Sequence, residues 1–221
     1  MKERADKLLV SLGVMVVKPS QVLSADDAIQ AQPAHPYVSR GGLKLAHALD
    51  VFGVDPSGRD CLDIGASTGG FTDVLVRAGA AHVTAVDVGH GQFHASLQGH
   101  PRITSLEGRD ARALTAADLP APPGLLVCDA SFISLEKLLD VPLGLAAPTA
   151  EFVGLFKPQF QVGRAHIGKG GLVTDTKATE QAAAAFSQWM KEKGWPIHAW
   201  TASPISGGDG NAERLFHARR T

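Results

Sequence analysis

The chain of 221 residues has little of several features that mark particular protein classes. It has only two cysteines, Cys61 and Cys128, each inside an apolar strand-like stretch, and no CxxC motif or His-rich pair at ligand spacing. Buried, reduced thiols are therefore expected rather than a disulfide, and we expect no metal site. The formal net charge is only −1, so contact with a polyanion would have to come from a local basic patch.

Long hydrophobic runs are also missing. The most apolar N-terminal stretch, from Leu8 to Val17, is too short to span a bilayer. The charged start, followed by Ser11 and Gly13, does not resemble a secretory signal, so we expect a cytoplasmic protein without a membrane span. With 44% hydrophobic and 19% charged residues, the chain suits one compact domain with room for a small appendage.

A proline-containing linker, Gln32 to Pro36, divides the chain. Before it, Arg4 to Leu12 is expected to form a helix and Val14 to Val17 a strand, so residues 1–32 are predicted to be a small α+β appendage. Residues 33–221 alternate between strand-like and helix-like stretches, which predicts an α/β domain with a seven-stranded, mostly parallel, doubly wound sheet. The expected strands are 59–64, 82–88, 102–107, 125–129, 151–157, 197–203 and 214–219, the last two antiparallel. The expected helices are 42–52, capped by Ser39, and 71–78, 111–119, 135–145 and 177–193, with a loop over 158–176.

The most informative segment is the turn from Asp63 to Phe71. An apolar stretch ends at Asp63, small residues follow, and an amphipathic helix begins at once. Glycines there allow a sharp turn and a close approach of a ligand to the backbone. Further acidic residues end later apolar stretches, namely Asp87, Asp110 and Asp129. Together these features predict a nucleoside-like cofactor across the carboxyl edge of a parallel sheet.

Other functions compete for these glycine-rich segments. The pattern G-x-S-x-G would make Ser67 a hydrolase nucleophile, with Asp129 as the acid and His217 as the base; we keep this alternative, although nothing upstream supplies the usual oxyanion loop. A dinucleotide fingerprint lacks its middle glycine, because Ser67 stands there. The segment 163–170 resembles a P-loop, but Gly170 stands where the Mg²⁺-binding hydroxyl is required, so we reject ATP binding there.

A cofactor without phosphates remains, and S-adenosylmethionine fits this requirement. On this interpretation the turn faces the amino-acid end of the cofactor, Asp87 accepts the two ribose hydroxyls, and Asp110 reaches the adenine amino group. Each aspartate alone is equally compatible with a helix cap or a strand end, so the argument depends on their joint spacing. The predicted cofactor-binding residues are Asp63, Gly65, Ala66, Ser67, Thr68, Gly69, Gly70, Phe71, Asp87, Asp110 and Asp129.

Four residues have the chemistry needed to alkylate a ribose hydroxyl: Lys44, Asp129, Lys157 and Glu213. A 2′-hydroxyl is a poor nucleophile and must lose its proton as the methyl group arrives. A lysine accepts that proton only in its neutral form, which burial or a nearby cation favours. Lys157 ends an apolar stretch and is the expected base, Lys44 adds a second positive charge, and the two carboxylates orient the ammonium groups. A solvated helix position for Lys44 and a strand-end charge reaching water for Lys157 are the simpler alternatives.

Five ordered blocks of sequence carry a resemblance to a known family. They are residues 37–45, 62–73, 129–135, 157–160 and 208–213. From about residue 33 to 220, the chain resembles the hemolysin A (TlyA-type) family, which is itself similar to the FtsJ-type ribose 2′-O-methyltransferases. The resemblance implies a Rossmann-like, S-adenosylmethionine-dependent methyltransferase acting on ribosomal RNA. It further implies that Lys44, Asp129, Lys157 and Glu213 form a catalytic tetrad.

The N-terminus departs from the family pattern. In the family, an RNA-binding module of a ribosomal-protein type precedes the catalytic domain; here its second helix and hairpin are missing between Gly13 and Val14, so residues 1–32 are interpreted as a truncated module. The expected RNA-binding residues are Arg40, Lys44, Arg164, Lys169 and Arg214, with Tyr37 and Phe160 as candidates to stack on a base. Two other functions stay open: a non-catalytic protein that binds RNA or ribosomes, and a membrane-active hemolysin, for which the sequence offers no basic amphipathic helix.

Overall fold

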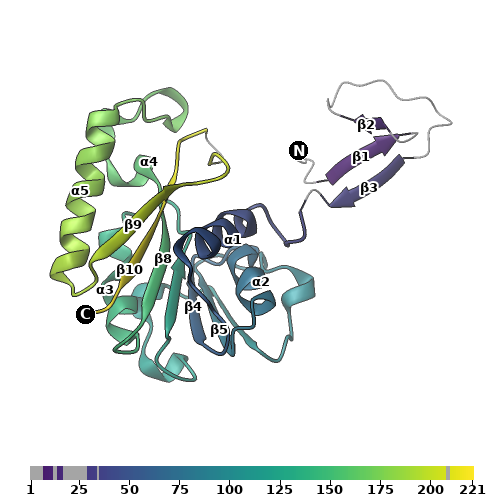
Figure 1. Cartoon of the computed structure of the whole chain (residues 1–221), viewed down its shortest axis with the longest axis horizontal. Coiled ribbons are helices and arrows are strands. Elements are labelled where there is room, and N and C mark those ends of the chain that lie inside the picture. Colours follow the sequence, from purple (N-terminus) through teal and green to yellow (C-terminus); the bar gives the residue numbers. More distant parts are fainter. Residues whose placement is uncertain (1–6, 12–13, 17–28, 34, 208–209) are drawn as a thin grey trace.

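The computed structural model describes residues 7–11, 14–16, 29–33, 35–207 and 210–221. The first three stretches are strands β1 (Lys7–Ser11), β2 (Val14–Val16) and β3 (Ile29–Pro33), which form an antiparallel sheet in the order β2-β1-β3 (Figure 1). The helix expected over Arg4 to Leu12 is therefore wrong at Lys7–Ser11, while the rest of it lies outside the described residues. Pairing on both edges of β1 outweighs the helical preference of its leucines.

A seven-stranded sheet forms the centre of residues 35–221. Its order is β6-β5-β4-β7-β8-β10-β9, and β10 runs antiparallel to both of its neighbours. The strands are β4 (Asp60–Ile64), β5 (His82–Asp87), β6 (Ile103–Glu107), β7 (Leu125–Cys128), β8 (Glu151–Phe156), β9 (Ile197–Ala202) and β10 (Arg214–Arg219). This confirms the mostly parallel sheet and its two antiparallel last strands. The strand order reverses beside β4, and in open α/β sheets ligands bind at the carboxyl ends of the strands at such a point.

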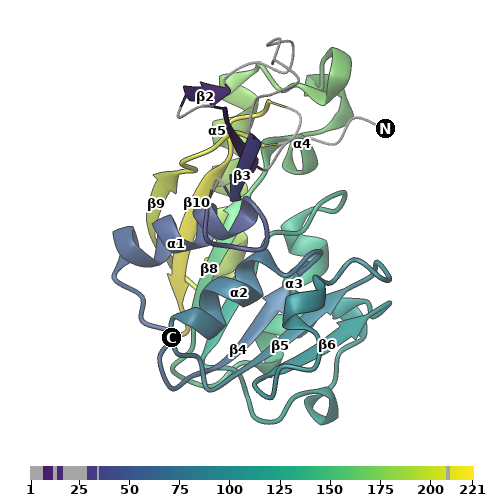
Figure 2. The same ribbon diagram turned by 90° about the vertical axis from the view of Figure 1, so that its right-hand side faces the viewer.

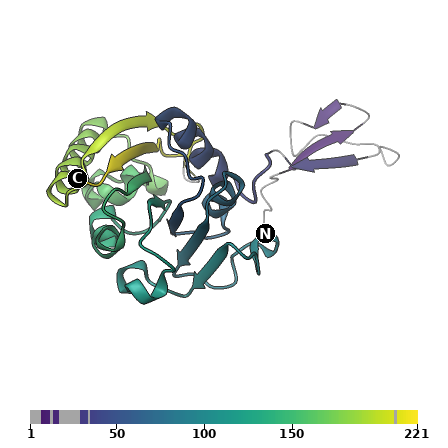
Figure 3. The same ribbon diagram turned by 60° about the horizontal axis from the view of Figure 1, so that its bottom comes forward.

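Helices cover both faces of this sheet (Figures 2 and 3). Helices α1 (Gly41–Phe52) and α2 (Gly70–Arg77) pack together on one face, while α3 (Leu135–Leu145) and α5 (Thr176–Glu192) pack on the other. Each face buries its own apolar cluster, one around Leu45 and Leu75 and the other around Phe186 and Trp195. The amphipathic patterns in the sequence therefore correspond to two helical layers around one sheet.

Two helix expectations are wrong in detail. In place of a helix over 111–119 there are two short 3₁₀ turns, η2 (Ala111–Ala113) and η3 (Ala116–Asp118). The carboxylate of Asp118 accepts hydrogen bonds from the backbone N–H and hydroxyl of Thr115, at 2.7 and 2.8 Å, which begins a new turn there and prevents a continuous helix. At α1 the N-cap is Arg40 rather than Ser39, whose carbonyl accepts from the backbone N–H of Gly42 at 3.0 Å.

The predicted loop over 158–176 is partly ordered into short helical turns. It contains α4 (Pro158–Gln161), η4 (Arg164–His166) and η5 (Lys169–Gly171), and η1 (Ala95–Leu97) lies earlier in the chain. Within the described residues, no helix is long and apolar enough to cross a membrane. Cys61 and Cys128 are free and buried, as expected, and burial raises the pKa of each thiol to about 12.

Candidate active site

The glycine turn after β4 lies against the neighbouring strand ends. Gly65 has a φ of 79°, in the region that favours glycine, and a Cβ there would lie 2.9 Å from the Cα of Ala130. The backbone N–H groups of Gly65 and Ala66 both donate to the carbonyl of Val86, at 2.9 and 3.1 Å. The turn is thereby fixed to β5 and β7 with its outer side facing a cavity.

Asp63 is completely buried behind this turn. One of its carboxylate oxygens accepts a 2.6 Å hydrogen bond from the hydroxyl of Thr72, and the other has no hydrogen-bond partner among the described residues. Burial raises the pKa of Asp63 to about 7, an effect that the Thr72 hydrogen bond only partly offsets. A buried carboxylate with an unsatisfied oxygen is suited to stabilise a cationic ligand at the turn.

Asp87 and Asp110 line a cavity of about 500 Å³ beside the turn. The carboxylate of Asp87 accepts from the backbone N–H groups of Ser67, at 2.8 Å, and Gly89, at 2.7 Å, so it is held at the end of β5. Asp110 accepts from the side chain of Arg112, at 2.6 Å, and this contact lowers the pKa of the carboxyl. We call this space the aspartate cavity; it is bounded by a carboxylate from each of two neighbouring strand ends.

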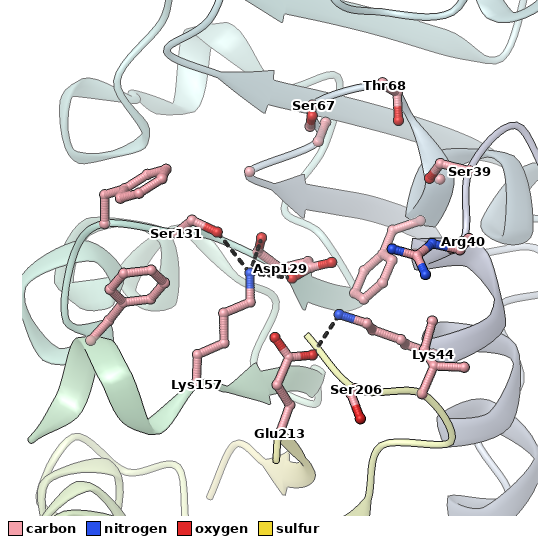
Figure 4. A pocket seen from close by; sticks show the side chains of 18 of the residues that line it. Ser39, Arg40, Lys44, Ser67, Thr68, Asp129, Ser131, Lys157, Ser206 and Glu213 are labelled. Atoms are coloured by element: carbon pink, nitrogen blue, oxygen red, sulfur yellow. Dashed lines mark hydrogen bonds and ion pairs between the residues drawn. The ribbon is translucent and has the colours of Figure 1, made fainter. Parts of the chain in front are cut away.

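The four predicted catalytic residues lie together in a second cavity of about 320 Å³, which we call the lysine cavity (Figure 4). The ammonium group of Lys44 is 2.5 Å from a carboxylate oxygen of Glu213. The ammonium group of Lys157 is 2.6 Å from a carboxylate oxygen of Asp129 and donates to the hydroxyl of Ser131 at 2.8 Å. The cavity therefore holds two lysine–carboxylate pairs.

The sheet explains how residues so distant in sequence meet. Asp129 directly follows β7 and Lys157 directly follows β8, so both lie at the carboxyl edge of parallel strands. Glu213 directly precedes β10, which runs antiparallel to β8 with Arg214 opposite Phe156, and this brings the start of β10 to the same edge. Lys44, in the first turn of α1, approaches this edge from one face of the sheet.

Both lysines are largely removed from water. Lys44 is 8% exposed and Lys157 is 7% exposed, so the solvated positions considered from the sequence are wrong for both. A buried ammonium group is stable only with a charged or strongly polar partner, and each lysine has one. The arrangement can hold a proton at either lysine and keep bulk water away from it.

The remaining predicted cofactor residues divide between the two cavities. Asp129, Gly65 and Ser67 line both of them, whereas Asp63 and Gly69 lie behind the turn and line neither. Those that line the lysine cavity alone are Ala66, Thr68, Gly70 and Phe71. The two cavities therefore adjoin at the glycine turn.

The predicted RNA-binding residues are more scattered. Arg40 lines the lysine cavity with Lys44, but Arg164, Lys169 and Arg214 are not among its described lining residues. Arg164 and Lys169 are exposed on the short turns η4 and η5. Arg214 pairs with Glu180 at 3.0 Å and lies 4.8 Å above the ring of Trp200, while Tyr37 packs against the core.

Several lining residues were not assigned a role from the sequence, among them Ser131, Phe132 and Gln159. Ser131 contacts Lys157, and Phe132 is 91% exposed with a φ of 67°, which is rare for a bulky side chain. The rings of Phe132 and Phe160 lie 5.3 Å apart at the cavity, and the buried side-chain oxygen of Gln159 has no partner among the described residues. Their position directly after Asp129 and Lys157 was the available signal.

The hydrolase alternative does not assemble. His217 lies in β10 and contacts Glu151 at 2.7 Å, at the other end of β8 from the lysine cavity. The hydroxyl of Ser67 contacts Gln92 at 3.3 Å, and Asp129 contacts Lys157. Ser67, Asp129 and His217 therefore form no triad, and this alternative is wrong.

Comparisons with known proteins agree with this geometry. The family model of FtsJ-like methyltransferases matches residues 37–220, most of the chain. The chain belongs to this family. The 16S/23S rRNA (cytidine-2′-O)-methyltransferase TlyA of Mycobacterium tuberculosis is 43% identical over 209 residues, which cover 94% of this chain and 78% of that protein. Hemolysin A of Brachyspira hyodysenteriae is 36% identical over 206 residues, which cover 93% of this chain and 86% of that protein.

Solved structures support the fold of this FtsJ-like enzyme. A structure from Streptococcus thermophilus has a TM-score of 0.84 at 36% identity, covering 97% of this chain and 79% of that one. The magnesium protoporphyrin IX methyltransferase of Synechocystis, solved with bound SAH, has a TM-score of 0.56 at 14% identity, covering 82% of each chain. The latter likeness shows the fold alone, a Rossmann-like methyltransferase domain.

The chain is a methyltransferase of the FtsJ-like family, and its residues fit S-adenosylmethionine as the methyl donor. The glycine turn borders both cavities, Asp87 offers a carboxylate at the end of β5, and the unsatisfied oxygen of Asp63 favours a cation nearby. In the part of the chain that the structure describes, no group of three or more His, Cys, Asp or Glu residues could hold a metal ion.

Proposed function

We propose that this FtsJ-like enzyme transfers a methyl group to a ribose 2′-hydroxyl of ribosomal RNA. The observation that carries the proposal is the pair of lysine–carboxylate contacts, Lys157–Asp129 and Lys44–Glu213, each with a buried lysine, in a cavity that adjoins the glycine turn. The name of the mycobacterial relative, a ribosomal RNA cytidine-2′-O-methyltransferase, supports the same reaction and substrate. Such an enzyme acts in the cytoplasm, where ribosomes are made.

Lys157 serves as the base in this mechanism. Its amine, held by Asp129 and Ser131, takes the proton from the 2′-hydroxyl as the oxygen is methylated. Asp129 then stabilises the ammonium group that results. Lys44, held by Glu213, places a second positive charge in the same cavity.

The glycine turn and the aspartate cavity hold S-adenosylmethionine, which supplies an activated methyl group when bound. Asp87 would accept the ribose hydroxyls, because a carboxylate suits a vicinal diol, and Asp110, which lines the same cavity, would bind the adenine end. The turn at Gly65 and Ser67 would hold the amino-acid end. Alignment of the methyl group with the hydroxyl accounts for most of the rate, since good positioning is worth about 7–11 kcal/mol.

The mouth of the lysine cavity has groups that suit an unpaired nucleotide. Phe132 and Phe160, whose rings lie side by side at the cavity, offer aromatic surface on which a base could stack, whereas Tyr37 packs against the core. Arg40 at the cavity, and Arg164 and Lys169 on the nearby segment, provide cationic groups for phosphates. Residues 1–32 remain a proposed truncated RNA-binding module, separate from the methyltransferase domain of residues 33–221.

Methyl transfer to ribosomal RNA can be measured directly. Purified ribosomal subunits from a strain that lacks this gene are incubated with the enzyme and S-adenosylmethionine labelled in its methyl group. We expect label in the RNA that survives alkaline hydrolysis within a dinucleotide, because a 2′-O-methyl group prevents cleavage at its own ribose. Label released in mononucleotides would indicate base methylation and contradict the proposal.

The two other candidate functions predict different outcomes. A non-catalytic protein would bind subunits without transferring label, yet it would gain nothing from two buried lysine–carboxylate pairs. A membrane-active protein would release dye from liposomes, and a leakage assay at low protein concentration tests this directly. No observation in the described residues favours either function over methyl transfer.

A further inference from the structure

Asn211 has no role in the mechanism above, yet it connects the segment that leads to Glu213 with a second loop. Its side chain is buried, with only 1% exposed. The amide oxygen accepts a 2.9 Å hydrogen bond from the backbone N–H of Val173, and the amide nitrogen donates to the carbonyl of Gly171 at 3.0 Å. Both ends of the amide are thus used, and both partners belong to the segment that contains η5.

Glu213 lies two residues after Asn211 and is closely confined. Its carboxylate contacts Lys44 on one side, and on the other side a Cβ added at Gly207 would lie 2.5 Å from one carboxylate oxygen. The backbone N–H of Gly207 donates to the carbonyl of Asn211 at 3.2 Å, which closes the loop. The position of Asn211 therefore determines how closely the backbone of Gly207 approaches Glu213.

We propose that Asn211 is a positioning residue that holds Glu213 against Lys44 by fixing the described residues just before Glu213, 210–212, to the segment around Gly171. This inference rests on the proposed function, since it adds a residue to the same tetrad. Asn211 itself does not line the described lysine cavity, so its effect on the reaction passes through Glu213. The two amide hydrogen bonds fix its orientation, and an aliphatic side chain could form neither of them.

Removing the amide takes the hydrogen-bond partner away from two half-buried backbone groups, the N–H of Val173 and the carbonyl of Gly171, and frees Asn211 from that segment. The loop then shifts relative to Lys44, and small misplacements of catalytic groups cost up to about 100-fold in rate. Cofactor binding should not change, because Asp63 on β4, Asp87 on β5 and Asp110 before η2 lie outside the segment that contains Asn211. The expected signature of Asn211→Ala is therefore a lower kcat at an unchanged KM for S-adenosylmethionine.

The experiment measures methyl transfer to ribosomal subunits by the full chain, with kcat expressed per cofactor-binding site so that misfolded protein is not counted. Asn211→Ala is compared with Glu213→Gln and with the double variant in single-turnover reactions with excess enzyme. If Asn211 acts through Glu213, its substitution lowers the rate in the wild-type background and changes little in the Glu213→Gln background. Gln188→Ala, which removes an exposed amide contact to Glu192 on α5, is the matched control and should match wild type.

Each outcome decides between the possibilities. Equal kcat for wild type and Asn211→Ala, or additive losses in the double variant, would overturn the inference while leaving the proposed function intact. Failure of the wild type to label RNA would instead contradict the proposed function. Should Asn211→Ala not fold, Asn211→Asp decides, because it keeps the acceptor for Val173 but opposes the carbonyl of Gly171 with a negative charge. Asn211→Asp should lower the rate of methyl transfer in the wild-type background and change it little in the Glu213→Gln background.

Discussion

At the scale of single residues, the site depends on charges removed from water. Lys44 and Lys157 are each buried beside one carboxylate partner, which compensates for the water that each side chain loses and keeps it in place. Asp63 is different, because it is buried with a hydroxyl partner on one oxygen and nothing on the other among the described residues. In the protein without a bound ligand, the charged form of Asp63 therefore lowers the free energy of unfolding.

Substitution of Asp63 should reveal that cost. The folded protein holds the Asp63 proton up to about pH 7, whereas the unfolded chain loses it near pH 4, so stability falls as pH rises between these values. Asp63→Asn should raise the unfolding temperature at pH 8, by an amount equivalent to a few kcal/mol at about 1.4 kcal/mol per pKa unit, and change it little at pH 4.

The same substitution should weaken cofactor binding at pH 8, because it removes the buried negative charge near the turn. Thermal unfolding and isothermal titration with S-adenosylmethionine measure the two effects. Asp60→Asn, at the start of the same strand, is the control and should show neither. An Asp63→Asn variant that was less stable than wild type at pH 8 would contradict the assignment of Asp63 as a destabilising buried charge.

At the scale of elements, the glycine turn sets the geometry. In Gly65→Ala, a residue with a left-handed backbone conformation carries a Cβ, which costs about 1 kcal/mol or more of stability. The added Cβ also lies 2.9 Å from the backbone of Ala130. Gly58→Ala is a matched control, since Gly58 has a φ of 70° but nothing within 4 Å of the added Cβ. We expect both variants to lose stability, but only Gly65→Ala to lose cofactor affinity. Equal affinity in both would show that the close approach to Ala130 is unimportant.

Most of the strands that the sequence predicts correctly are apolar stretches with a charged residue at their carboxyl end. Asp87, Asp129 and Lys157 each follow an apolar strand, so parallel pairing alone predicts that they meet at one edge. The sequence did not predict that Lys7–Ser11 is a strand, because β1 depends on two partner strands rather than on its own pattern. The roles of Ser131 and Asn211 were missed for a similar reason: their contacts join segments far apart in sequence.

At the scale of the whole molecule, the two ends of the sheet have different charge chemistry. Away from the site, Glu151 at the start of β8 accepts from Arg59 at 2.8 Å and from His217 at 2.7 Å. Burial lowers the pKa of His217. Burial alone would raise the pKa of Glu151, but its hydrogen bonds to Arg59 and His217 outweigh this effect and lower that pKa. Both groups therefore resist protonation in the folded protein, and their contribution to stability is lost as pH falls.

Acid should therefore destabilise the molecule through this cluster. The loss begins as pH falls below about 6.5, where the unfolded histidine takes up a proton that the folded one resists, and continues below about pH 4.5 for Glu151. His217→Gln should reduce the decrease in unfolding temperature between pH 7 and pH 5, measured by calorimetry. His166→Gln, at an exposed histidine, is the control. An unchanged decrease in His217→Gln would contradict this origin of acid sensitivity.

The most direct test of the account compares Lys157→Ala with Asp87→Ala, each measured for methyl transfer to ribosomal subunits and for binding of S-adenosylmethionine. We expect Lys157→Ala to lose transfer by at least about 100-fold, the scale of general base catalysis, while its cofactor Kd stays near that of wild type. Asp87→Ala should instead bind the cofactor less tightly and recover transfer at high cofactor concentration. Transfer by Lys157→Ala at a rate comparable to wild type would remove Lys157 from the mechanism and contradict the central claim.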